Sequence, residues 1–396
     1  MRALLVCNPK ATTTSDRVRD VLVRALRSET ELDVAYTRRR GHGASLAREA
    51  RKNGVDVVVT LGGDGTVNEV VNGLLADGTG ADVPALAVVC GGSTNVFARA
   101  LGLPTDWAEG TAVILEALRA GRTRSVGLGK VASLGAGTGL GLTERYFTFC
   151  AGFGMDAEVI HRVERARLRG RKSTPLLYMQ AMAGNYIFEK SSRTPRITIE
   201  SPEIDLGATG GATGGAISGA ADGTANEAGP EAGPETGQEA GKEAGRKAAD
   251  RPGKAAAEDG ERGNTDSDVE GDQKRAVDKL TMVVIQNTAP WTYIGDRAID
   301  ASPEASFDLG LDVMGIRDPS MIGTTRTMVQ LLAGRRSKET GLAIGPHGKH
   351  VIRLHDLSEF TLSAKLPAGL QVDGDYLGEQ DEVRFSAVPD AIRVVC

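Results

Sequence analysis

The sequence predicts an α/β fold in two parts: a parallel sheet covered by helices, then a β-rich part built as an antiparallel sandwich with helices. Up to about Gly121, short apolar strands alternate with helices whose apolar residues recur every three or four positions. Beyond that point, short runs of alternating polar and apolar residues dominate, which are typical of antiparallel strands. We therefore expect one domain over residues 1–122 and a second over 123–381.

Four apolar runs predict the strands of the first part, at residues 2–7, 31–37, 55–60 and 85–90. The valines of the third run suggest a central parallel strand that is buried on both faces. The helix after the first strand has its apolar stripe at Val18, Val21, Leu22, Ala25 and Leu26, with Ser15 or Thr14 as the cap.

Seven alternating runs predict the strands of the second part, at 125–131, 146–150, 196–200, 279–286, 307–313, 351–354 and 360–364. Helices are expected near 157–169 and 174–188. Residues 203–277 differ from both parts, because they are rich in Gly, Ala and Glu and lack apolar periodicity. Such a segment cannot bury enough apolar surface to offset its ordering entropy, so we expect a disordered insertion.

Composition places the chain among soluble globular proteins. Of 396 residues, 40% are hydrophobic and 25% are charged, and the net charge of −5 disfavours nucleic acid as a partner. No apolar run is long enough to span a bilayer, and the N-terminus resembles a first strand more than a signal peptide. The cysteines at 7, 90, 150 and 396 form no CxxC pair, which suggests free thiols in a reducing cytosol.

Two glycine loops, 62–66 (GGDGT) and 91–95 (GGSTN), each follow a buried strand and precede a helix. Loops at the carboxyl ends of parallel strands share one edge of the sheet. Glycines there let backbone N–H groups approach an anion at a helix N-terminus. Alternatively, the glycines only make tight turns, but two such loops on one edge favour a nucleotide.

Other phosphate and dinucleotide motifs are absent. The chain has no G-x-x-x-x-G-K-[ST], and residues 170–173 (GRKS) have the wrong spacing. Neither glycine loop is a G-x-G-x-x-G, and the glycine run at 135–141 has no helix after it. A dinucleotide-dependent dehydrogenase is therefore disfavoured.

Residues 62–75 (GGDGTVNEVVNGLL) together with 91–104 (GGSTNVFARALGLP) resemble the diacylglycerol kinase catalytic-domain family, which includes sphingosine and ceramide kinases. Asn8-Pro9, Thr37 and Gly41-His42-Gly43 resemble its N-terminal motifs. Residues 150–157 (CAGFGMDA) and 371–375 (QVDGD) are similar to its later aG.G.DA and VDGE segments. The family is related more distantly to NAD kinases, which share GGDGT.

The resemblance implies an active site in a cleft between the two domains, with the final strand, near 391–395, returning to complete the first domain through residues 382–396. It implies ATP and Mg²⁺ as cofactors, with transfer of the γ-phosphate to a lipid hydroxyl. Diacylglycerol, giving phosphatidic acid, is the expected substrate. The alternatives are a sphingoid, ceramide-like or other lipid-alcohol kinase, an NAD kinase, or a catalytically silent nucleotide or lipid sensor.

The resemblance also implies the nucleotide-binding positions. They are Asn8, Thr37, Gly62, Gly63, Gly65, Thr66, Asn68, Glu69, Gly92, Ser93, Thr94 and Asn95. Arg99 could face phosphate or be a solvated helix residue. The residues that hold the metal are left open.

Asp64 and Asp375 are the expected catalytic carboxylates. A carboxylate among phosphate-facing glycines is electrostatically costly unless it binds a metal or accepts the hydroxyl proton, although Asp64 could also cap a helix. Asp375 stands where the family usually has glutamate, which makes the side chain one methylene shorter. It could also belong to a plain β-turn. Which of the two is the base is left open.

Asp156 matches a position that contacts the lipid head group in the sphingosine-kinase branch of the family, and it could equally cap the helix that follows. The basic segment 161–172, with Val159, Ile160 and Val163 as apolar contacts, suggests docking on anionic lipid; a solvated face is the alternative. We thus expect a cytoplasmic protein, peripheral to the inner face of the membrane, that acts on a lipid substrate at the membrane surface and could form a homodimer.

Overall fold

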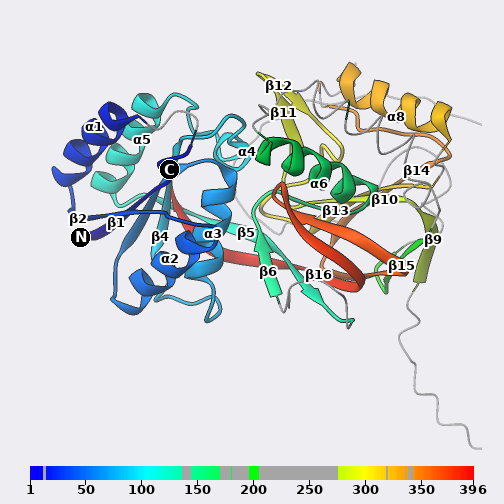
Figure 1. The fold of residues 1–396 in the computed structure, drawn as a ribbon, viewed down its shortest axis with the longest axis horizontal. Coiled ribbons are helices and arrows are strands. Elements are labelled where there is room, and N and C mark those ends of the chain that lie inside the picture. Colours follow the sequence, from blue (N-terminus) through cyan, green and yellow to red (C-terminus); the bar gives the residue numbers. More distant parts are fainter. Residues whose placement is uncertain are drawn as a thin grey trace, which may run out of the picture. The chain divides into compact units, whose positions relative to one another are not determined.

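Four parallel strands form the first part of the sheet. The computed structural model describes residues 1–11, 15–135, 144–169, 180, 196–204, 275–317, 320–334, 336–337, 341 and 343–396. The four strands are β1 (Arg2–Cys7), β2 (Glu31–Tyr36), β3 (Val57–Gly62) and β4 (Ala85–Cys90). They lie in the order β4-β3-β1-β2, and each pairs in parallel with its neighbour (Figure 1).

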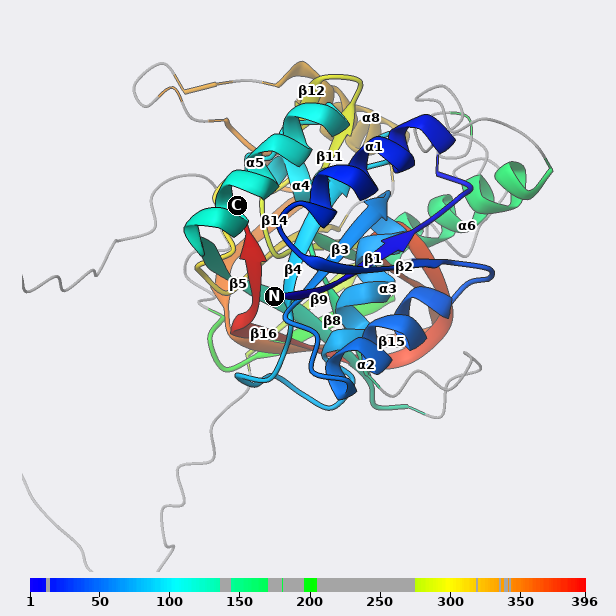
Figure 2. The same ribbon diagram turned by 90° about the vertical axis from the view of Figure 1, so that its left-hand side faces the viewer.

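Helices cover both faces of these strands, as the alternating pattern predicts (Figure 2). On one face, α2 (His42–Lys52) and α3 (Asp64–Leu74) pack in a cluster with Val6, Val58 and Leu86. On the other, α1 (Asp16–Arg27) and α5 (Trp107–Ala120) pack with Leu5 and Val59. All six residues of β3 are buried, which confirms the expected central strand.

The remaining strands continue the same sheet, mostly in antiparallel pairs. They are β5 (Thr123–Ser133), β6 (Glu144–Phe147), β7 (Cys150–Gly154), β8 (Ile197–Ser201), β9 (Arg275–Leu280), β10 (Met282–Gln286), β13 (Leu311–Ile316), β14 (Val351–Leu357), β15 (Glu359–Val372) and β16 (Asp375–Val395). The path runs β14-β13-β10-β7-β15-β16-β4. A separate hairpin joins β11 (Thr292–Ile294) and β12 (Arg297–Ile299), and the described helices here are α6 (Met155–Leu168) and α8 (Met321–Ala333).

Strand β16 connects the two parts. It pairs with β15 and β5 along its length, and Val394 then lies parallel to Leu86 of β4. The final strand therefore returns to the parallel strands as expected. The mixed α/β fold class is confirmed, whereas the division at residue 122 stays a prediction because the sheet is continuous there.

Several element boundaries differ from expectation. The run 146–150 forms two strands, because the backbone N–H groups of Thr148 and Phe149 turn to Asp373. The ends of the expected insertion, 203–277, are ordered: Ile204 and Val277 are buried in the β-rich core, and 275–277 begin β9. Residues 205–274 and most of the expected helix 174–188 lie outside the described residues, and α8 was not expected.

Candidate active site

Four strands end at one edge of the sheet and bring distant segments together. Cys7 pairs with Tyr36 and Leu61, and Gly62 pairs with Cys90, so the ends of β1 to β4 are level. The segments that follow are those of Asn8, Thr37 and the two glycine loops. The prediction that both glycine loops share one edge is thus confirmed.

The two glycine loops touch each other through their backbones. The Gly91 N–H donates to the Gly62 carbonyl over 2.8 Å. A Cβ on Gly91 would lie 2.8 Å from the Gly62 nitrogen, and one on Gly92 would lie 2.6 Å from the Gly63 Cα. These glycines are therefore required by loop-to-loop contact. At Gly65, by contrast, a Cβ would meet nothing within 4 Å, so its backbone borders open space.

Polar side chains of the loops bind one another. Asn8 donates from Nδ2 to Thr66 Oγ1 over 3.1 Å, and Thr66 packs over Gly62. Asn95 adopts a left-handed backbone conformation with φ of 49°, and its amide exchanges two hydrogen bonds with the Gly92 backbone. These contacts hold the loops in one shape, with Ser93 exposed beside them.

Asp64 begins α3 and points to a second helix. Its Oδ1 accepts the Phe97 N–H over 3.2 Å, so it also satisfies the start of α4 (Val96–Ala100). Burial raises the pKa of the Asp64 carboxyl to about 6, although backbone N–H groups of Val96 and Phe97 act in the opposite direction. No cationic side chain of the described residues forms an ion pair with it. The capping role that the sequence allowed is thus present, but toward α4.

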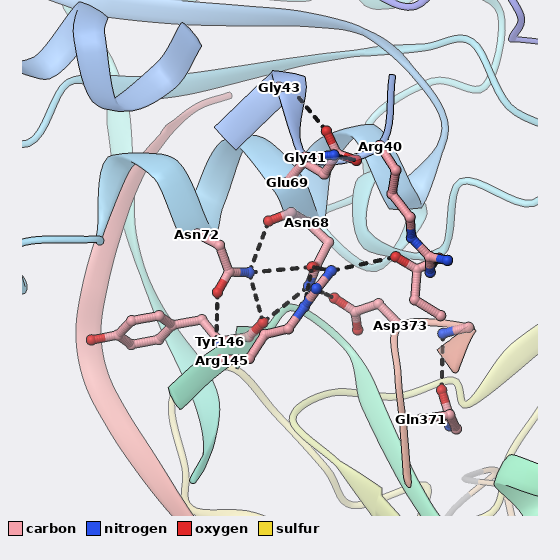
Figure 3. A network of polar contacts seen from close by, with 12 residues as sticks. Arg40, Gly41, Gly43, Asn68, Glu69, Asn72, Arg145, Tyr146, Gln371 and Asp373 are labelled. Atoms are coloured by element: carbon pink, nitrogen blue, oxygen red, sulfur yellow. Dashed lines mark hydrogen bonds and ion pairs between the residues drawn. The ribbon is translucent and has the colours of Figure 1, made fainter. Parts of the chain in front are cut away.

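Asn68 is the centre of a buried network (Figure 3). Its Nδ2 donates to Asp373 Oδ2 over 2.7 Å and to the Tyr146 carbonyl over 3.0 Å. Its Oδ1 accepts Arg145 Nη2 over 2.6 Å and is shared with Asn72. Since Asn68 is fully buried, both ends of its amide are occupied by protein, and the structure favours a linking role over direct nucleotide contact.

Glu69 is likewise occupied by backbone. Its two carboxylate oxygens accept the N–H groups of Gly41 and Gly43 over 2.7 and 2.9 Å (Figure 3). Gly41 precedes α2 with φ of 79°, so Glu69 places a negative charge at the start of that helix. This contact accounts for both the glycines of Gly41-His42-Gly43 and the glutamate of GGDGTVNE.

The turn between β15 and β16 is anchored by Asp373. This buried carboxylate accepts hydrogen bonds from Asn68 Nδ2, from the Thr148 hydroxyl and from the N–H groups of Thr148, Phe149 and Cys150. Burial raises the pKa of Asp373 above its ordinary value, while these hydrogen bonds lower it. Asp373 and Gly374 have φ of 48° and 81°, which supports the β-turn expected here.

Asp375 follows this turn and lies between two arginines. Arg40 Nη2 is 3.0 Å from its Oδ1, and Arg145 Nη2 is 3.3 Å from its Oδ2. Its charge is therefore neutralised by protein in this structure.

Asp156 is buried in the first turn of α6. Gln371 donates to its Oδ2 over 2.9 Å, and burial raises the pKa of Asp156 to about 6. A Cβ on Gly152 would overlap the same carboxylate, which explains the glycine in GFGMDA. A lipid contact by Asp156 stays a prediction.

Two expected surface roles change. The Arg99 guanidinium lies 3.4 Å from the Tyr293 ring centroid and donates to the Gly295 carbonyl, and its side chain is only 15% exposed, so it is not a solvated helix residue. In α6, Val159 and Val163 are buried against the protein and cannot serve as the apolar lipid contacts that the sequence suggested. The basic segment 161–172 is described only to residue 169.

The site residues fit a nucleotide with Mg²⁺. No group of three or more His, Cys, Asp or Glu side chains that could hold a metal was found in the described part of the chain. Mg²⁺ bound with phosphates, however, needs only one or two carboxylates from the protein. Asp64, whose charge no described cation neutralises, suits that task, and open space at Gly65 leaves room for a phosphate beside it.

Sequence reasoning missed Arg40, Arg145, Asn72, Gln371 and Asp373. The last two lie within the segment similar to VDGE, which was interpreted only as a turn plus Asp375. Asn72 lies within 62–75, where only the positions up to Glu69 were assigned a role. Arg40 and Arg145 carry no motif, and their partners are far away in the chain.

The N-terminal part of the chain is similar to known lipid kinases. Residues 2–131 match the family described as the diacylglycerol kinase catalytic domain. The chain is 36% identical over 112 residues to a diacylglycerol kinase of Staphylococcus haemolyticus, covering 28% of this chain, and 42% identical over 99 residues to a Chromohalobacter salexigens protein named "probable lipid kinase YegS-like", covering 25%. Each match spans 32% of the relative's length.

The fold is also shared with a solved structure. A crystal structure of a diacylglycerol kinase from Bacillus anthracis aligns over 100% of this chain and 96% of its own, with a TM-score of 0.55 at 15% identity. In the described part of the chain, no helix has the length and apolar character needed to cross a membrane. Residues 2–131 are thus similar to the diacylglycerol kinase catalytic domain.

Proposed function

We propose that the chain is an ATP-dependent lipid kinase, with diacylglycerol as substrate and phosphatidic acid as product. The observation that carries this proposal is the contact between the two glycine loops, with Asp64 beside them, inside the segment that matches the diacylglycerol kinase catalytic domain. Two of the similar proteins are named as a diacylglycerol kinase and a lipid kinase, which supports this substrate class.

In the proposed reaction, the lipid hydroxyl oxygen forms a bond to the γ-phosphorus, and the bond from that phosphorus to the β–γ bridging oxygen breaks. ADP leaves with the electron pair, and the hydroxyl proton passes to a carboxylate. Bound Mg²⁺ would neutralise charge on the phosphates. The chain contributes Asp64 or Asp375 as proton acceptor and the glycine loops as positioning elements.

A labelled-ATP assay against a lipid panel tests this function. The panel contains diacylglycerol, sphingosine, ceramide and monoacylglycerol in mixed micelles, with NAD as a soluble arm and Asp64→Asn as the inactive control. Transfer of label to diacylglycerol is expected. Transfer only to another lipid would change the substrate, and ATP binding without any transfer would favour a sensor.

We also propose that the exposed arginines of α6 meet anionic lipid. Arg165 and Arg169 are exposed near the end of the described part of this helix. Replacing both with alanine should reduce co-sedimentation with phosphatidylserine vesicles. Unchanged co-sedimentation would contradict a membrane role for this segment.

A further inference from the structure

Two arginines from distant segments hold one carboxylate from both sides. Arg40 lies in the loop between β2 and α2, and Arg145 lies on β6. Their Nη2 atoms approach different oxygens of Asp375, at 3.0 and 3.3 Å. Guanidinium groups bind phosphate oxygens with the same charge and geometry that they use for carboxylates.

Arg145 is more buried than Arg40 and is held by hydrogen bonds in addition to its ion pair. Arg145 donates from Nε and Nη2 to Asn68 Oδ1 over 3.1 and 2.6 Å, and its side chain is only 22% exposed. The Arg40 side chain is 60% exposed, and its further acidic neighbours are Glu164, at 3.5 Å, and Glu69. Since exposed ion pairs contribute little free energy, Arg40 can exchange one anion for another at small cost.

The turn before Asp375 is held by hydrogen bonds that do not involve the Asp375 side chain. Asp373 is bound by five hydrogen bonds, and the Gly374 N–H donates to Gln371 Oε1 over 2.9 Å. A competing anion would therefore displace only the Asp375 side chain from the arginines and leave the turn in place.

The arginine pair is linked to the helix that follows the first glycine loop. Asn68, which holds Arg145, stands four residues after Asp64 on α3, so the two side chains project from the same face of the helix. A phosphate group positioned beside Asp64 would thus be close to Arg145.

We propose that Arg40 and Arg145 form a binding site for a terminal phosphate group, and that Asp375 occupies this site until the phosphate arrives. The phosphate dianion takes the place of the Asp375 carboxylate on the two guanidinium groups, and the displaced carboxylate can then accept the substrate proton. The proposal deepens the proposed kinase function and rests on it for the source of the phosphate, which is either the terminal phosphate of ATP or that of the phosphorylated product.

Calorimetric titration of the full chain with inorganic phosphate tests the site without any turnover. Arg40→Ala should weaken binding about tenfold, as expected for losing one hydrogen bond to a charged group. The neighbouring exposed Arg39→Ala is the matched control and should bind as the natural chain does. Asp375→Asn should tighten binding roughly threefold or more, because the competing charge is gone.

Unchanged binding in Arg40→Ala, or weaker binding in Asp375→Asn, would overturn the proposal. Circular dichroism checks that each variant is folded. Titrations with ATP, ADP and a short-chain phosphatidic acid separate the two sources. If the γ-phosphate binds here, Arg40→Ala weakens the binding of ATP but not that of ADP. If the product phosphate binds here, Arg40→Ala weakens the binding of phosphatidic acid. If Arg40→Ala changes the binding of neither ATP nor phosphatidic acid, the site is absent. If phosphate binding follows these expectations but no lipid is phosphorylated, the kinase function fails and the site remains.

Discussion

The glycine-loop edge and the β15–β16 turn each bring a carboxylate to the candidate site. The two carboxylates differ in whether protein cations neutralise their charge. Asp64 is partly buried, hydrogen-bonded to backbone N–H groups, and its pKa is raised to about 6. Asp375 is paired with two arginines on a turn fixed by Asp373. The first carboxylate thus favours a proton or a metal ion, while the second is occupied until another anion releases it.

The largest expected effect is on turnover. Asp64→Asn should lower kcat/KM by roughly 10²–10⁴-fold, because it removes the one charge at the loops that protein cations do not neutralise. Initial rates over a range of diacylglycerol concentrations measure this ratio. Asp77→Asn, which alters an exposed pair with Arg48, should behave as the natural chain. Activity of Asp64→Asn within a factor of about two of the natural chain would remove Asp64 from catalysis.

Replacing Asp373 and replacing Asp375 should lower the free energy of unfolding by different amounts. Asp373→Asn should cost about 2–4 kcal/mol of unfolding free energy, because several buried N–H donors lose a charged acceptor. Asp375→Asn should cost less than about 1 kcal/mol, since its ion pairs are partly exposed. Guanidinium unfolding at pH 7 compares them. Equal losses would show that the turn is not anchored by Asp373.

The ionised form of Asp64 should destabilise the fold at neutral pH. Its pKa is raised from 3.8 to about 6, so the folded state binds the proton more tightly than the unfolded chain. That stabilisation is complete below about pH 4 and is lost as pH rises through about 6. Two pKa units set a ceiling of about 3 kcal/mol, and partial exposure reduces the expected value to about 1–2 kcal/mol.

Asp64→Asn should therefore be more stable than the natural chain at pH 7–8, and the two should converge toward pH 4. Chemical unfolding at four pH values measures the difference. A constant difference across this range would contradict the raised pKa. In the natural chain, kcat/KM should rise with pH through about 6 as Asp64 ionises.

The smallest expected effect lies outside both regions. Arg99→Lys should lower stability by about 0.5–1 kcal/mol, because lysine cannot stack on Tyr293 and donate to Gly295 with the same geometry. KM for ATP should stay unchanged. A marked rise in KM for ATP would instead indicate that Arg99 contacts the nucleotide phosphates.

The two regions also differ in how far they could be predicted. The glycine-loop edge follows from local patterns, since apolar strands, helical stripes and GGDGT place Asp64, Thr66 and Asn95 on adjacent loops. Parallel strands of similar length bring such loops together regardless of the rest of the chain. The surroundings of Asp375 depend on Arg40 and Arg145, and no local pattern indicates that these residues meet.

The turn shows the same limit within a single motif. Asp373-Gly374 predicts a tight turn from backbone preferences alone. The partners of the Asp373 carboxylate, at Asn68 and at 148–150, lie more than 200 residues away in sequence. Only folding reveals that this acid anchors the structure and that its neighbour faces the arginines.

The sequence by itself determined the fold class, the shared edge of the glycine loops and the resemblance to a kinase family, because short-range periodicity and motif spacing encode them. Tertiary structure decided which charges are free and which are neutralised. Electrostatic environment depends on side chains that meet across the folded chain, and a carboxylate in a motif has no fixed role until its burial and its partners are set.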